Sequence, residues 1–195
     1  MPTLLFACLL VLEAFGFKWK VPIESEWAVD EKTQTLRMLA PAADANPHPR
    51  RPLQYALAET PLFDSVTLEL EVKRDKSSLI LVYAWRDENH FDYAHLSVDA
   101  PAKQPVHNGI FHVYGGDRVR ISNESGPGAL PIQDWTPVKL TWSAKTGEVW
   151  VEVSGQKLDS LHAVDLSLGA GRVGIGSFFE TAQFRNLRIS GVPAR

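Results

Sequence analysis

Apolar and polar residues alternate along most of the chain beyond residue 16. The stretch SVTLELEVK (65–73) places apolar side chains at every second position, and this period of two is typical of a half-buried antiparallel strand. Similar runs predict strands at 78–85, 92–98, 109–114, 118–122, 137–143, 148–154, 171–178 and 182–190. Stretches such as GGD, KTG and SGQ separate the runs and have the composition of turns. About ten short strands without a helical period predict an all-β fold, an antiparallel two-sheet sandwich or jelly roll.

The first residues follow a different pattern. Residues 4–12 (LLFACLLVL) form a short apolar run that is followed by small residues, as in the apolar region and cleavage site of a secretory signal. We therefore expect residues 1–16 to be removed, although no Lys or Arg precedes the run; the alternative is a buried N-terminal segment. Residues 17–195 would then form a single domain without cysteine, because Cys8 is the only one in the chain.

Composition narrows the class of protein. The 195 residues are 45% hydrophobic and 22% charged, which is the balance of a globular protein rather than a disordered one. The formal net charge of −3 argues against nucleic acid as a partner. Beyond the N-terminal run no stretch is long and apolar enough to span a bilayer. These features predict a secreted or periplasmic protein and leave its oligomeric state open.

Two C-terminal segments resemble a known superfamily. DWTPVKLTWSAKTGEVWVEVSGQ (134–156) and DLSLGAGRVGIGSFFETAQFRNLRI (165–189) are similar to the C-terminal half of concanavalin A-like lectin/glucanase sandwiches, including laminin-G-like and 3-keto-disaccharide hydrolase-type domains. The matching positions are Trp135, Gly147, Gly155, Gly171, Gly174, Gly176, Phe184, Asn186 and Ile189. The resemblance covers about residues 53–190 and implies a concanavalin A-like jelly roll. It implies no single activity, because lectins, hydrolases, lyases and adhesion modules share this fold.

Alternation also assigns side chains to the two faces of the predicted sheets. In DYAHLSV (92–98), Ala94 and Leu96 should face the core, which leaves Tyr93 and His95 on the outer face. The same reasoning gives an inward series of Ile80, Val82, Ala84, Phe111 and Val113, and an outward series of Tyr83, Trp85, His112, Tyr114, Arg118 and Arg120. The ligand-binding residues predicted from this face and its loops are Tyr83, Trp85, Arg86, His90, Tyr93, His95, His107, Asn108, His112 and Arg118.

Such a face has the chemistry for carbohydrate. Aromatic rings stack on the apolar faces of sugars, and Arg and His bind hydroxyls or uronate carboxylates. The leading hypothesis is therefore a secreted carbohydrate-recognising domain, with an anionic sugar favoured by the arginines. Alternatively, the face is ordinary sheet surface or belongs to a protein-binding adhesion module.

An enzyme that degrades polysaccharide is the other alternative. In a uronate lyase, Tyr93, His95, His112 and Arg118 would supply the base, the acid and the cation that neutralises the carboxylate. A glycoside-cleaving hydrolase is less supported, because the chain lacks the Glu-x-Asp-x-x-Glu strand of the laminarinase type.

No cofactor or metal is assigned from the sequence. His107 and His112 differ by an odd number, so a regular strand places them on opposite faces, and they could share a zinc or copper ion only through a bulge at Gly109. Structural calcium remains open at Asp87, Glu88 and Asp92, whose oxygens cluster around one turn.

Two placements are testable from coordinates. A hairpin through Gly115 and Gly116 should bring His112 and Arg118 to one face beside His95, where the arginine would lower the pKa of the histidine. His107 should organise its loop through a hydrogen bond with the backbone. In the Pro-rich loop 40–52, Arg50 or Arg51 should reach an anionic sugar.

Overall fold

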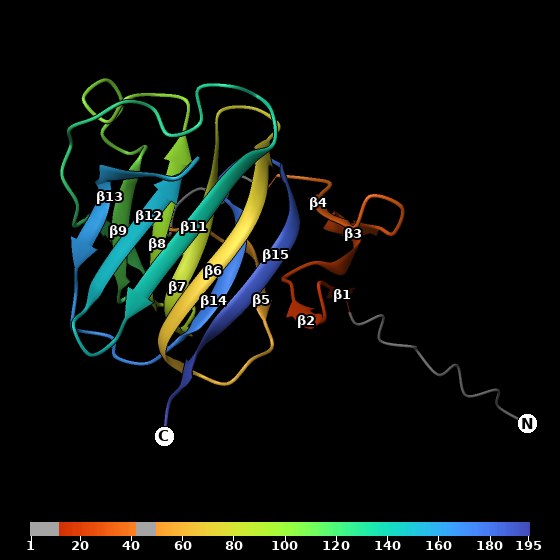
Figure 1. The fold of residues 1–195 in the computed structure, drawn as a ribbon, viewed down its shortest axis with the longest axis horizontal. Coiled ribbons are helices and arrows are strands. Elements are labelled where there is room, and N and C mark those ends of the chain that lie inside the picture. Colours follow the sequence, from red (N-terminus) through yellow and green to blue (C-terminus); the bar gives the residue numbers. More distant parts are fainter. Residues whose placement is uncertain (1–11, 42–49) are drawn as a thin grey trace, which may run out of the picture.

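The structure, a computed structural model, describes residues 12–41 and 50–195 and confirms the all-β prediction (Figure 1). The described ranges contain one short 3-10 helix and fifteen strands. Their bounds are β1 Leu12–Ala14, β2 Phe17–Lys20, η1 Glu24–Glu26, β3 Trp27–Asp30, β4 Thr35–Met38, β5 Gln54–Ala58, β6 Phe63–Arg74, β7 Ser78–Asp87, β8 His90–Ser97, β9 Gly109–Tyr114, β10 Asp117–Arg120, β11 Thr136–Ser143, β12 Glu148–Val153, β13 Gln156–Val164, β14 Arg172–Ser177 and β15 Ala182–Pro193.

The strands form two antiparallel sheets. An eight-stranded sheet has the order β1-β2-β5-β14-β7-β8-β9-β10, and a seven-stranded sheet has the order β13-β12-β11-β6-β15-β4-β3. The sheets stack face to face, with the seven-stranded sheet nearer the viewer in Figure 1. No helix in the described part of the chain is long and apolar enough to cross a membrane.

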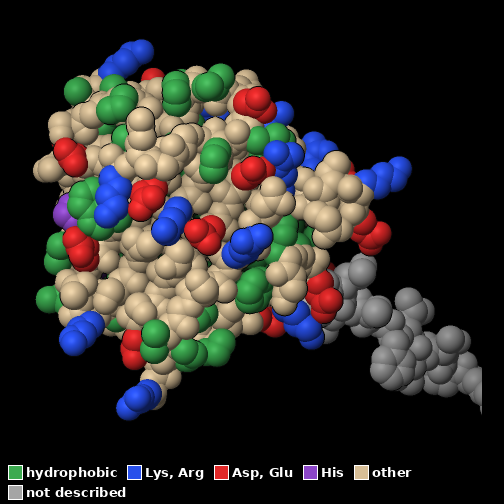
Figure 2. All heavy atoms as spheres, viewed as in Figure 1, with side chains coloured by type: hydrophobic (Ala, Val, Ile, Leu, Met, Phe, Trp, Pro, Cys, Tyr) green, Lys and Arg blue, Asp and Glu red, His purple; other side chains and the backbone are tan. Residues whose placement is uncertain are grey.

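The main core lies between the two sheets. The inward side chains of β6 are Val66, Leu68, Leu70 and Val72, all of them buried, as the alternation of this segment predicts. The opposite, outward face of the seven-stranded sheet carries acidic and basic side chains interspersed with uncharged ones (Figure 2). This sheet therefore has one buried face and one solvated face.

The eight-stranded sheet is different because it is buried on both faces. A second apolar cluster covers its outer face, away from the other sheet, and consists of Tyr55, Leu57, Ile80, Val82, Phe91, Tyr93, Phe111 and Val113. The predicted facing of β7 and β9 is therefore wrong: Ile80 and Val82 point outward, and Tyr83 lies in the main core. Since apolar residues occupy consecutive positions in these strands, alternation could not distinguish the two faces.

A bulge near the end of β7 places Trp85 on the face to which it was assigned from the sequence. Ala84 has a positive φ of 48°, and the pairing of β7 with β8 shifts register between Tyr83 and Asp87. The extra residue turns Trp85 to the outer face, where it packs against the second apolar cluster. Trp85 therefore lies on the face of Tyr93 as predicted, but Tyr83 does not.

The N-terminal hairpin joins β1 to β2 at one end of the eight-stranded sheet. Ala14 is buried, and its carbonyl oxygen accepts a hydrogen bond of 3.0 Å from Trp19 Nε1. The predicted cleavage site after Gly16 lies in the turn of this hairpin, and residues 1–11 of the predicted signal lie outside the described residues. Removal of residues 1–16 stays a prediction; it would leave β2 as the edge strand of the sheet.

Candidate functional site

The outer face of the eight-stranded sheet holds several of the predicted ligand-binding residues, but most of them are buried. The rings of Tyr93 and Phe111 stack with centroids 5.2 Å apart, and both side chains are almost inaccessible. Arg118 covers this pair: its Cζ lies 4.3 Å from the centroid of Phe178 and 5.6 Å from that of Phe111. The cation therefore packs on rings of the protein itself.

His95 belongs to the same buried cluster. Its Nδ1 lies 2.8 Å from the carbonyl oxygen of Val106, and its buried Nε2 has no hydrogen-bond partner among the described residues. Burial lowers the pKa of His95 to about 3, and the charges of His107, Arg118 and Arg120 act in the same direction. His95 is thus a neutral core histidine near pH 7.

Burial removes the main support for the lyase assignment. Tyr93 has no exposed surface, and burial raises the pKa of its hydroxyl, so very little of the phenolate form is present near pH 7 to act as a base. His95 is equally enclosed, with 3% of its surface exposed. A uronate bound at the surface would reach neither side chain.

His107 and Asn108 hold the loop before β9. Nδ1 of His107 lies 3.0 Å from Ser97 Oγ and 3.1 Å from Asp99 Oδ2, so it is tied by side chains rather than by the backbone contact that we predicted. Asn108 is fully buried, and its Oδ1 accepts hydrogen bonds from the backbone amides of Ser97 and Ala129. Nδ1 of His107 and Oδ1 of Asn108 are therefore both engaged within the protein.

An open groove does exist beside Trp85 on this outer face. It has a volume of about 250 Å³ and is lined by Lys20, Val21, Pro22, Arg51, Leu53, Tyr55, Leu57, Trp85 and Glu88. The indole Nε1 of half-buried Trp85 donates a hydrogen bond of 2.9 Å to the Tyr55 hydroxyl, which fixes the ring in place. Two cations and one carboxylate therefore surround a fixed aromatic wall.

Most of the other predicted residues border this region without entering the groove. Arg86 donates to the carbonyl oxygen of Ala170 at 2.9 Å. Nδ1 of His90 lies 2.8 Å from Asp87 Oδ1, and its ring contacts Tyr114 edge to face. Arg50 pairs with Asp117 at 3.0 Å, whereas Arg51 lines the groove and donates to Asn89 at 3.3 Å.

The predicted pairing of His112 with Arg118 is wrong. In the hairpin of β9 and β10, Arg118 lies opposite Val113, and Val119 lies opposite His112. Since directly opposed residues point to the same side of a sheet, His112 and Arg118 lie on opposite faces. The hairpin forms as expected, but its register places the arginine one residue away from the predicted partner.

His112 instead faces the space between the sheets, where it meets two carboxylates. Its Nδ1 lies 2.7 Å from Asp92 Oδ1 and 2.8 Å from Asp165 Oδ2. Asp92 is directly opposite His112 on β8, whereas Asp165 follows β13 of the other sheet. We call these three residues the Asp–His–Asp cluster.

The electrostatics of this cluster are the reverse of those predicted for His112. The pKa of His112 is raised, chiefly by the hydrogen bond to Asp92. The neighbours of this imidazole are two carboxylates rather than an arginine, and they favour its charged form. Burial raises the pKa of Asp92 to about 6, against the opposing effect of His112. Tyr83 lies directly opposite Asp92 on β7. The pKa of its hydroxyl is raised, mainly by burial and also by the negative charges of Asp92 and Asp165.

The suggested calcium ligands are not brought together. Asp92 points between the sheets, while Asp87 accepts hydrogen bonds from Asn89 and His90 at the exposed turn. Among the described residues, the group of acidic and histidine side chains close enough to share an ion is the Asp–His–Asp cluster, to which Asp87 and Glu88 do not belong.

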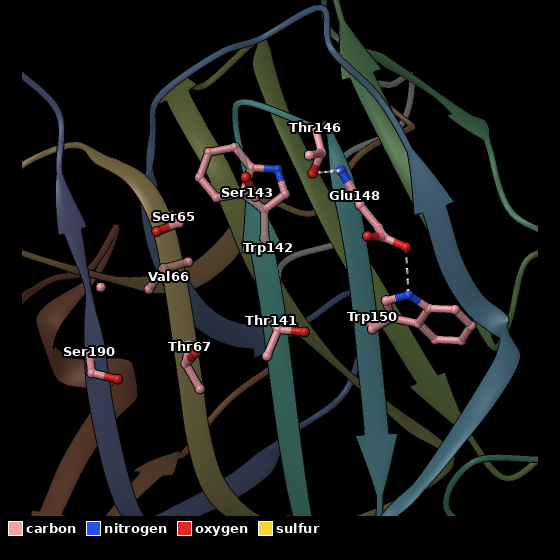
Figure 3. A pocket seen from close by; sticks show the side chains of 11 residues that line it. Ser65, Val66, Thr67, Thr141, Trp142, Ser143, Thr146, Glu148, Trp150 and Ser190 are labelled. Atoms are coloured by element: carbon pink, nitrogen blue, oxygen red, sulfur yellow. Dashed lines mark hydrogen bonds between the residues drawn. The ribbon is translucent and has the colours of Figure 1, made fainter.

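The solvated face of the seven-stranded sheet has its own groove, of about 310 Å³ (Figure 3). Hydroxyl side chains from β6, β11, β15 and the turn before β12 line it, together with Glu148 and Trp150 of β12. The Trp150 ring stacks on His162 with centroids 3.8 Å apart, and Lys157 Nζ lies 4.6 Å from its centroid. The indole is thus engaged by neighbouring side chains and is a weaker platform for a sugar than Trp85.

Sequence reasoning missed Lys20, Tyr55 and Asp165. Tyr55 lies on β5, whose five residues are all buried and do not alternate. Asp165 opens the segment DLSLGAG, which has only the pattern of a turn. No signal in the sequence links Asp165 to His112, because Asp165 lies in a loop after a strand of the other sheet.

Comparison with solved structures identifies the fold. Carbohydrate binding module CBM66 from Bacillus subtilis superposes with a TM-score of 0.64 at 14% identity, covering 89% of this chain and 95% of that one. The fold is that of a concanavalin A-like sandwich.

Two further structures agree. A Bacillus subtilis protein with a galectin-like fold gives a TM-score of 0.52 at 13% identity, with 92% and 90% of the two chains covered. Alginate lyase AlyC3 gives 0.52 at 13% identity, with 88% of this chain and 80% of the lyase covered. No protein-family model matches the sequence, and no curated protein does.

Proposed function

We propose that this protein is a secreted or periplasmic carbohydrate-binding domain whose ligand lies in the groove beside Trp85. The observation that carries the proposal is the fixed indole: Trp85 is tied to Tyr55 and forms the wall of an open groove on the outer sheet face. A rigid aromatic ring loses little conformational entropy when a sugar stacks on it. Sandwiches of this fold include a carbohydrate-binding module and an alginate lyase, which is consistent with a sugar ligand.

The charges of the groove favour an anionic sugar. Lys20 and Arg51 provide two cations against the single carboxylate of Glu88. A uronate carboxylate would bind the guanidinium of Arg51 in a bidentate fork while the apolar face of the ring stacks on Trp85. The neighbouring Arg50 is already paired with Asp117.

The test is retention of the protein in gels that contain neutral or uronate-rich polysaccharides. Trp85→Ala should weaken retention about tenfold or more, because it removes the stacking surface. Trp150→Ala is the matched control, since it removes an indole from the opposite side of the molecule. Loss of retention in the Trp150 variant, with the Trp85 variant unaffected, would place the site on the other sheet.

The same samples distinguish the alternatives. Release of unsaturated uronate ends would indicate a lyase, and new reducing ends without unsaturation would indicate a hydrolase. Absence of retention across both classes of polysaccharide would contradict sugar binding and favour a protein-binding adhesion module.

A further inference from the structure

The Asp–His–Asp cluster lies where the two sheets meet, apart from the Trp85 groove. Asp92 and His112 are opposed on β8 and β9 of the eight-stranded sheet, and Asp165 approaches from the end of β13 in the seven-stranded sheet. The side chains of Asp92, His112 and Asp165 are 2%, 13% and 15% exposed. The cluster is enclosed but reachable from solvent.

The Asp165 carboxylate accepts hydrogen bonds from Ser167, but hydrogen bonds do not neutralise the charge of this cluster. Nδ1 of His112 carries at most one hydrogen, yet it lies within 2.8 Å of an oxygen of each carboxylate. Even with a charged imidazole, two carboxylates leave a net negative charge in a largely buried place. Enclosed negative charge is costly unless a cation compensates it.

A second observation comes from Tyr83, which extends the row of Asp92 and His112 onto β7. Its side chain is 1% exposed, and its hydroxyl makes no hydrogen bond of normal geometry with the described residues, although the Asp92 carboxylate adjoins it. Buried hydroxyls normally have a partner, so an unpaired one next to Asp92 points to a group that binds there.

We propose that Asp92, His112 and Asp165 bind a divalent transition metal ion such as Zn²⁺, with the Tyr83 hydroxyl available to the ion or to a water bound to it. The three ligand atoms lie within 4.8 Å of one another. One imidazole nitrogen and two carboxylate oxygens suit Zn²⁺ and its neighbours, and two carboxylates neutralise its charge.

The change needed to admit the ion is small. Ligand bonds of about 2.0–2.2 Å place neighbouring ligand atoms about 3.3 Å apart in a tetrahedral site. The two separations at Nδ1 are 2.7 and 2.8 Å, so the side chains must open by about half an ångström. Since the ligands come from both sheets, the ion would join them and stabilise the folded state.

The proposal is tested on the full, untagged chain after treatment with EDTA, by titration with Zn²⁺ and by the visible absorption of Co²⁺. We expect each chain to bind one Zn²⁺ ion and the Tm to rise when it does. Bound Co²⁺ should show the visible absorption of a site with few ligands, all of them nitrogen or oxygen. Asp165→Asn should weaken binding about 100-fold or more, and Tyr83→Phe about tenfold. Asp165 lies in a loop, where its carboxylate accepts hydrogen bonds from the amide and hydroxyl of Ser167. Asn keeps an oxygen that can accept from the Ser167 amide, so this substitution should preserve the loop even if a variant of Asp92 fails to fold.

His107→Gln is the matched control, because it removes a histidine whose Nδ1 contacts a single carboxylate, that of Asp99. Binding that is unchanged in this variant and lost in Asp165→Asn supports the site. No binding of Zn²⁺ or Co²⁺, binding of equal strength in Asp165→Asn, or a preference for Ca²⁺ would each overturn the proposal. The result does not depend on whether the chain binds sugar.

Discussion

His95 and His112 lie on neighbouring strands of one sheet, yet the charges around them are opposite. His95 is packed on the outer face among aromatic rings and two arginines, and burial keeps it neutral. His112 faces the space between the sheets, and two carboxylates favour its charged form. The identity of a residue in a strand therefore does not determine its chemistry; the face on which the register places it does.

The largest expected effect comes from removing the imidazole between the carboxylates. In EDTA, His112→Ala should lower the free energy of unfolding by about 3 kcal/mol at pH 7, because it leaves Asp92 buried without its partner. Urea denaturation measures the loss. His107→Ala should cost clearly less, since the side chain of Asp99 is 28% exposed and can be hydrated. Equal losses in the two variants would contradict the distinction between the two environments.

The second effect is a dependence of stability on pH that arises from His95. The unfolded chain takes up this proton below pH 6.5, but the folded chain does so only near pH 3. The unfolded state thus binds more protons between these values, so stability rises with pH across the window and falls as pH is lowered. The contribution is at most about 1.4 kcal/mol per pH unit.

His95→Asn tests this directly, because its amide can still donate to the Val106 carbonyl but cannot titrate. Between pH 6.5 and 4, the urea midpoint of the native protein should fall more steeply than that of the variant. Parallel curves would show that His95 is protonated in the folded state or accessible to solvent.

The smallest effect concerns the cation on the outer face. Arg118→Ala should lower the free energy of unfolding by about 1 kcal/mol, because it removes the cation and the aliphatic stem from the rings of Phe111 and Phe178. Arg118→Lys retains a cation and should lose less. If Arg118→Ala instead abolished sugar retention without changing stability, the ligand site would extend from the Trp85 groove to this arginine.

Alternation predicted the positions of β6–β12, β14 and β15 but not those of β1–β5 and β13, and it assigned strand faces unevenly. In β6 one face is solvated, so the inward residues could be assigned correctly. In β7, Leu79, Ile80, Leu81 and Val82 are all fully buried, and no contrast remains from which a face could be deduced. The bulge at Ala84 then reverses the facing of Trp85 for a reason that lies in the backbone.

The strand β13 and the residues Asp165 and Tyr55 were also not predicted, again because the sequence around them shows no contrast. The segment of β13, QKLDSLHAV, lacks a regular period, and its pairing with β12 is interrupted by a register shift between Trp150 and Glu152. Asp165 and Tyr55 reach their partners only through contacts between distant segments. A single sequence shows such residues as ordinary turn or core positions until the topology is known.

The position of β15 has a consequence for how this protein is made. Although it is the last strand in the chain, it lies inside the seven-stranded sheet, between β6 and β4. A ribosome that has synthesised the first 181 residues has therefore produced two strands whose facing edges have nothing to pair with. Such edges attract other chains. Until residues 182–193 take their place, these two edges stay unpaired, and we expect a chain that stops before residue 182 to aggregate more readily than the whole chain.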